Sequence, residues 1–120
     1  MTIISGQILS IDADYVKEYE KDLLKLEKDY RYIRDDLAQA FKILRSDPTR
    51  CDVKRIPNLK TKFPIYKVRK IFSSDLKDWH RLRLIYAHDI SMKGIFPIEV
   101  YVKGRDDNED KARILRYFST

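Results

Sequence analysis

HRLRLIYAHD, residues 80–89, is the stretch that decides the fold. Residues two apart in a strand point to the same face. The segment Arg81–His88 therefore predicts a strand with an apolar face made of Leu82, Leu84 and Tyr86. Its other face carries Arg81, Arg83 and Ile85, so the strand is apolar on one side and cationic on the other.

The same alternation occurs in one segment before this strand and in one after it. IYKVRKIF predicts a strand over Ile65–Phe72, with Lys67 and Arg69 on one face. FPIEVYVKGR predicts a strand over Ile95–Val102, followed by Lys103 and Arg105 on the matching face. The connections are short, so neighbouring strands are expected to be antiparallel. Paired in this way, the three strands would gather six basic residues on one wall of a sheet.

The basic wall is expected to contain almost no acidic residues. Glu99 is its one acidic member, and Ile71, Ile85 and Tyr101 would form an apolar floor that something covers. The opposite wall must cover a core, because a register shift of one residue would bury several charges. A plain antiparallel sheet with one solvated face is the alternative interpretation.

The segment from Tyr15 to Leu44 contains neither Gly nor Pro and predicts helix. Apolar residues recur at steps of three or four between Val16 and Leu44, which forms a single stripe. Two arrangements fit this pattern. One is a long single helix or coiled coil; the other is a hairpin broken near residues 28–31, which would bury the stripe within one domain. Asp47-Pro48 ends the segment.

Shorter elements complete the predicted order. Gln7–Ile11 predicts a short strand, Asp12 or Asp14 can cap the first helix, and Thr49–Pro64 predicts a loop. Asp106 or Asp107 is expected to cap a last helix, Asn108–Phe118, whose inner face is Ala112, Leu115 and Phe118. The fold class is therefore α+β: a helical hairpin packed on an antiparallel sheet of about four strands, with a C-terminal helix. Residues 1–120 are expected to form one domain.

Composition narrows the class of partner. The chain has 120 residues and a formal net charge of +6, which points to a polyanion or to an acidic protein that masks the charge. Cys51 is the single cysteine, which fits a reducing compartment. We expect a cytoplasmic protein without a signal peptide or membrane span. We also expect no metal site, because His80 and His88 lack accompanying ligands.

At these residues the chain resembles the RelE/ParE superfamily of bacterial and archaeal type II toxins. The order of its elements is the family's order, and the likeness covers nearly the whole chain. RLRLIY together with EVYVKGRDDNEDKARI is most similar to the RelE-like mRNA interferase branch. The segment from Tyr15 to Pro48 is similar to the family's two helices, which favours the hairpin over the long helix.

The resemblance implies an antiparallel sheet with helices on one side. It also implies an endoribonuclease that cuts ribosome-bound mRNA, arrests growth, needs no cofactor and is held inactive by a cognate antitoxin protein. By position, Lys67, Arg69, Arg81 and Arg105 match the family's basic groove. The family's C-terminal Tyr has no clear counterpart: Lys111 stands near its place, and Tyr117 is the next aromatic residue.

The implied reaction uses the substrate 2′-OH as nucleophile, so the protein must hold a phosphate and move protons. We expect catalytic roles for Arg81, Arg105 and Lys67. RNA contacts are expected from Arg69, Arg83, Lys103 and Tyr101. The candidate proton carriers are His80, His88 and Tyr117.

Two alternative functions stay open. A ParE-like toxin would inhibit a topoisomerase without cutting anything, and it needs no phosphate-cleaving groove. A non-catalytic basic module would bind nucleic acid or an acidic partner, and the missing Tyr favours it. The clustered basic residues favour the nuclease over the ParE-like toxin.

Overall fold

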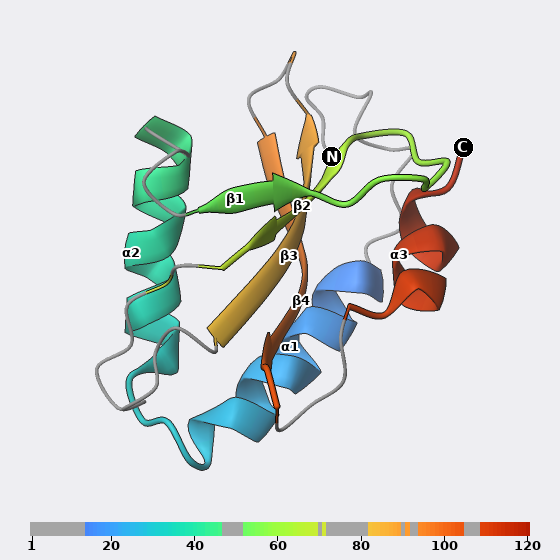
Figure 1. Ribbon diagram of the computed structural model, residues 1–120. Coiled ribbons are helices and arrows are strands. Elements are labelled where there is room, and N and C mark those ends of the chain that lie inside the picture. The colour runs from blue at the N-terminus through green and yellow to red at the C-terminus, as the bar shows by residue number, and fades with distance from the viewer. Residues whose placement is uncertain are drawn as a thin grey trace.

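The computed structural model describes residues 14–46, 52–69, 71, 82–89, 91, 94–104 and 109–120. Its elements follow the order α1 (Asp14–Glu27), α2 (Ile33–Ser46), β1 (Val53–Arg55), β2 (Ile65–Val68), β3 (Leu82–Asp89), β4 (Gly94–Val102) and α3 (Lys111–Phe118). Two helices precede a four-stranded antiparallel sheet, and one helix follows it (Figure 1). The predicted α+β class is therefore confirmed.

The helical segment folds as a hairpin and not as one long helix. Helix α1 ends at Glu27 and α2 begins at Ile33, so the break lies where the sequence placed it. Arg34 joins the two helices: its guanidinium binds both carboxylate oxygens of Glu20 at 2.9 and 2.8 Å and reaches Glu27 at 2.9 Å. The apolar stripe is buried along most of its length, and Val16, 45% exposed, is the exception.

The strands pair in the order β1-β2-β3-β4, each antiparallel to the next. Lys67 lies opposite Ile85, and Arg83 lies opposite Tyr101, so alternation places these side chains on one face as predicted. Strand β2 is shorter than expected and ends at Val68. Ile71 therefore escapes the alternation: it packs in the core under the hairpin and not on the basic face, which corrects its assignment.

Two hydrophobic cores lie on the two faces of the sheet. The hairpin core packs α1 and α2 against one face, through residues such as Leu26, Leu37, Leu84 and Val102. The C-terminal core joins α3 to the other face and contains Ile56, Ile65, Ile85, Ala87, Ile98, Tyr101, Ile114 and Phe118. The helices are thus not all on one side, contrary to what the resemblance implied.

A β-bulge in β4 explains why Ile98 belongs to the C-terminal core. Ile85 pairs with Glu99, whereas the next residue, Tyr86, pairs with Pro97, so Ile98 is the extra residue. In the part of β4 that precedes the bulge, each side chain therefore points to the face opposite to the one that unbroken alternation predicts. Phe96 and Ile98, which we expected on the hairpin face, consequently pack with α3.

The ends of the fold depart from the sequence reading in two places. The fourth strand is β1, within the segment predicted to be a loop; the predicted strand Gln7–Ile11 lies outside the described residues. Helix α3 begins at Lys111 and is capped by Asp110, whose side chain accepts a hydrogen bond from the Arg113 backbone at 3.0 Å.

The inner face of α3 also differs from the predicted one. Arg113, Ile114 and Phe118 are buried, whereas Ala112 and Leu115 are exposed. Arg113 explains why a different side of α3 is buried. Its guanidinium donates to the Ile98 carbonyl and forms ion pairs with Glu18 and Asp22 at 2.9 and 3.0 Å. This arginine ties α3 to α1 and to β4.

Candidate functional site

Strand β1 brings two cations to the sheet that the sequence reading left in a loop. Lys54 lies directly opposite Lys67, and Arg55 lies opposite Tyr66. Like charges opposite each other destabilise a strand pair. A negative charge beside Lys54 and Lys67 relieves this repulsion, and Glu109 supplies one at 2.7 Å from Lys67.

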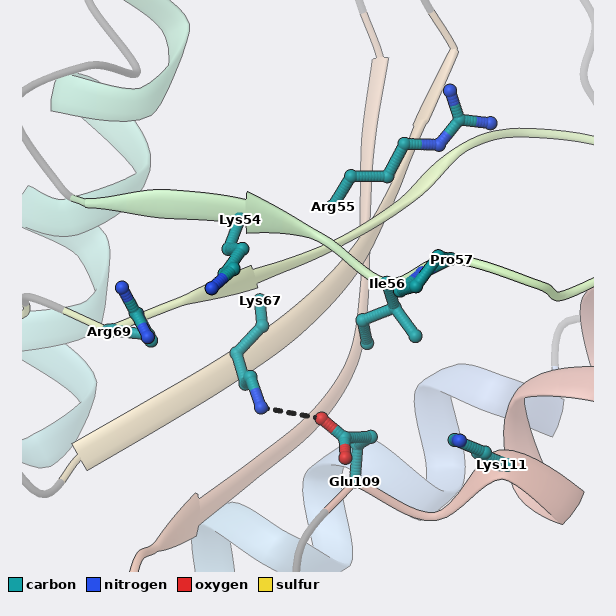
Figure 2. Close-up of a pocket in the computed structure, with 8 residues that line it drawn as sticks. All are labelled: Lys54, Arg55, Ile56, Pro57, Lys67, Arg69, Glu109 and Lys111. Atoms are coloured by element: carbon teal, nitrogen blue, oxygen red, sulfur yellow. Dashed lines mark hydrogen bonds and ion pairs between the residues drawn. The ribbon is translucent and has the colours of Figure 1, made fainter.

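A groove of about 260 Å³ opens between this part of the sheet and the segment before α3 (Figure 2). Its cations come from β1, from β2 and the residue after it, and from the start of α3; they are Lys54, Arg55, Lys67, Arg69 and Lys111. Ile56 and Pro57 supply apolar lining, and Glu109 is the one carboxylate among the described lining residues. A polyanion is the ligand that this charge balance favours.

Glu109 stands against Lys67 inside the groove. The Lys67 Nζ–Glu109 Oε1 distance is 2.7 Å, and the two side chains are only 23% and 13% exposed (Figure 2). Burial strengthens this charge-assisted hydrogen bond, because few waters compete for it. An ammonium that donates to a carboxylate has no lone pair for accepting a proton, so the geometry favours a charge role for Lys67 over that of a base.

Arg69 lies at one end of the groove, just after β2. Its guanidinium is 3.2 Å from Asp52 Oδ2, and its backbone N–H donates to the Asp52 carbonyl at 3.2 Å. Asp52 has a φ of 50°, in the left-handed region, where Asp is one of the more tolerant residues. Both ionic side chains are more than one-third exposed, so a phosphate could displace this carboxylate at little cost.

Tyr101 lies on the basic face of the sheet, in its apolar floor, but does not line the groove. It is only 3% exposed and packs with Ile65 and Ile85, which confirms that this floor is covered, by α3 and the chain around it. Burial, helped by the nearby carboxylate of Glu109, raises the pKa of Tyr101 to about 12. Its predicted contact with RNA would require the floor to open.

Glu99, the one acidic residue expected on the basic wall, anchors the start of α3. Its Oε1 accepts a hydrogen bond from the Asp110 backbone N–H at 3.0 Å. A further hydrogen bond joins the backbone of Glu109 to the Tyr101 hydroxyl. Two side chains of β4 therefore hold the backbone at residues 109 and 110, and this fixes where the Glu109 carboxylate stands.

The environment of Glu99 makes stability depend on pH. Burial raises the pKa of Glu99 above its usual 4.5, so the folded state binds the proton more tightly than the unfolded chain does. The resulting stabilisation is complete below the unfolded-state pKa and is lost as pH rises through the folded-state pKa. We therefore expect Glu99→Gln to gain stability relative to the original chain as pH rises from about 4, measured by urea denaturation.

Glu20→Gln is the control with the opposite sign. Hydrogen bonding to Arg34 lowers the pKa of Glu20, so its contribution appears above the unfolded-state pKa and is lost as pH falls. This variant should lose stability relative to the original chain over the same rise in pH, although by little, because the group is exposed. A pH-independent difference for Glu99→Gln would contradict the assignment.

The remaining predicted residues lie at or beyond the edge of the groove. Arg83 shares its face, but its guanidinium turns back to the carbonyls of Arg69 and Leu82 at 3.4 and 3.3 Å. Lys103 is exposed just after β4 and does not line the groove. Arg81, Arg105 and His80 lie outside the described residues, so their roles stay predictions.

Two candidate proton carriers are placed away from the groove. His88 shares its face with Tyr86, opposite the groove, and its ring lies 6.2 Å from that of Tyr66. Tyr117 lies on α3 with the Arg116 guanidinium 5.1 Å from its ring. Tyr117 does not line the groove, and burial together with the Glu18 carboxylate of α1 raises the pKa of its hydroxyl.

Sequence reasoning missed Lys54, Arg55 and Glu109 as members of the site. A three-residue strand ending two residues before Pro57 is too short to show alternation, and Glu109 belongs to no strand. Only the overall run of basic residues after Cys51 could have indicated the first two. Glu109 reaches Lys67 across 42 residues of sequence, and the spacing of residues along the chain could not predict such a contact.

The described residues contain no cluster of side chains able to hold a metal ion. Among the same residues, no helix is both long and apolar enough to cross a bilayer. Comparison of the chain with protein-family models, curated proteins and solved structures found no match. The likeness to RelE-type toxins therefore rests on the sequence patterns described above.

Proposed function

We propose that this protein is the toxin of a type II toxin–antitoxin system and acts as a ribosome-dependent mRNA endonuclease. The observation that carries the proposal is the groove: five cations around one carboxylate, on the sheet face that strand alternation predicts to be basic. Phosphoryl chemistry on RNA needs little beyond positioned cations and proton carriers, because the substrate provides its own nucleophile. Its substrate would place the protein in the cytoplasm.

The groove suits a phosphate backbone because cations line it from more than one element. Lys54 and Lys111 make no ion pair within the described part of the chain, and the Asp52 partner of Arg69 is half-exposed. These cations come from β1, α3 and the end of β2, so a bound strand would contact both walls. A cognate antitoxin would neutralise this surface, as the resemblance implies.

A non-catalytic RNA-binding module is the second candidate. It is favoured by a specific observation: the described lining residues include no histidine, and Lys67 is already bound to Glu109. Such a protein would bind single-stranded RNA through the same cations and release it uncut. The two candidates therefore predict equal binding and different products.

Expression in bacteria from a tightly repressed promoter separates these functions. The nuclease should arrest growth and produce mRNA 5′ ends clustered at positions within ribosome-bound codons. A DNA-damage response without such ends would favour the ParE-like alternative. Undisturbed growth, with RNA binding by the purified protein, would favour the non-catalytic module.

A further inference from the structure

We propose that Glu109 is the general base of RNA cleavage, an inference that rests on the proposed function. The reaction needs a group that takes the proton from the 2′-OH. The cationic lining residues, lysines and arginines, are hydrogen-bond donors without an acceptor. Among the described side chains that line the groove, Glu109 is the one that accepts a proton readily.

The position of Glu109 supports this role. Its carboxylate points into the groove from the segment before α3, toward Lys67 on β2 (Figure 2). Oε1 is bound to Lys67, whereas Oε2 accepts no hydrogen bond from the described residues. One oxygen is thus held in place while the other can receive the substrate hydroxyl.

The backbone around Glu109 is held in place before substrate arrives. The Glu99 carboxylate accepts a hydrogen bond from the Asp110 N–H at 3.0 Å, and the Glu109 backbone hydrogen-bonds to the Tyr101 hydroxyl. Catalytic groups work best when neighbouring hydrogen bonds fix them on rigid elements. Glu99 and Tyr101 are both on β4 and do not line the groove, so they position the base without touching the substrate.

Lys67 completes the proton path. Oε2 of Glu109 accepts the 2′-OH proton as the O2′–P bond forms and the P–O5′ bond breaks. The Lys67 ammonium, held 2.7 Å from Oε1, gives a proton to the leaving O5′, and the neutral amine regains one through solvent as Glu109 releases the proton it took. The products are a 2′,3′-cyclic phosphate and a 5′-hydroxyl end, and the pair returns to its starting protonation.

The test compares Glu109→Gln with the original full-length chain on purified ribosomes programmed with an mRNA. We expect cleavage to slow by ~10²–10⁴-fold, the usual contribution of a general base. RNA binding should persist or become tighter, because the described lining of the groove loses its one negative charge. Glu109→Asp should retain part of the activity, since it keeps a carboxylate on a shorter side chain.

Glu27→Gln is the matched control, because it changes net charge equally and lies on α1, away from the groove. It should cleave like the original chain. Cleavage by Glu109→Gln at or above the original rate would overturn the inference and make Glu109 a competitor that RNA displaces from Lys67. An original chain that binds RNA without cutting it would instead overturn the proposed function, and this inference with it.

An mRNA with a single 2′-deoxy nucleotide at the cleavage site checks the nucleophile. The original chain should leave this site uncut while binding the RNA normally. Cutting there would overturn the inference, because Glu109 would have no 2′-OH proton to accept. Uniform folding of the variants is checked by their urea midpoints.

Discussion

Replacing Arg113 by Met is expected to lower the free energy of unfolding by about 3 kcal/mol. Arg113 is 7% exposed and bridges three elements: Glu18 and Asp22 on α1, and the Ile98 carbonyl on β4. Without the guanidinium, two carboxylates lose their buried counter-ion and a buried carbonyl loses a hydrogen bond at once. The carboxylates keep some contact with water, which holds the loss near the lower end of the range for broken buried ion pairs.

Two further variants distinguish a buried ion pair from a general loss of packing. Arg116→Met removes an exposed arginine that also contacts Glu18, at 3.3 Å, and should cost less than ~1 kcal/mol. Adding Asp22→Asn to Arg113→Met should restore about 1 kcal/mol, because it removes a carboxylate that has lost its counter-ion. Urea denaturation measures all of these changes. Equal losses for the two single arginine variants would show that burial of Arg113 does not matter.

Neutralising three groove cations should greatly weaken binding to single-stranded RNA. The variant is Lys54→Gln, Arg69→Gln and Lys111→Gln, one cation from β1, one from the end of β2 and one from α3. If each contacts one phosphate, the slope of log K against log salt should fall in magnitude by about 2. At low salt the affinity should fall on the order of 100-fold.

The control removes the same net charge from the hairpin. Lys21, Lys42 and Arg45 are exposed on α1 and α2 and do not line the groove. Changing all three to Gln should leave the salt slope within about one unit of the original. Binding is measured by fluorescence anisotropy of a labelled oligonucleotide across a salt series. If both triple variants weaken binding equally, the protein binds RNA by net charge and not through this groove.

Much of the fold could be predicted because alternation and helical periodicity are local signals. The hairpin break near residues 28–31 and the faces of β3 were correct, since each depends on neighbours within a few positions. The prediction failed where strand pairing ends or shifts and the alternation of side chains is interrupted. Ile71 lies beyond the end of β2, and Ile98 sits in a bulge that only pairing with β3 creates.

The site was predicted only in part, for the same physical reason. Lys67 and Arg69 were found because strand alternation marks them, although Arg69 lies one residue beyond β2. Lys54 and Glu109 were missed, because a three-residue strand and the short segment before a helix are too short to show a periodic pattern. The predicted proton carriers His88 and Tyr117 face other elements, and their sequence positions could not reveal this.

The sequence by itself determined an α+β chain with a basic sheet face, because hydrophobic burial forces each strand to turn its cations away from the hairpin. Only the tertiary structure decided what meets that face. Helix α3 covers part of it through Phe118 and Ile114, and the chain before α3 brings Glu109 to Lys67. Contacts between residues 42 positions apart arise from packing and charge pairing in three dimensions, and no local pattern encodes them.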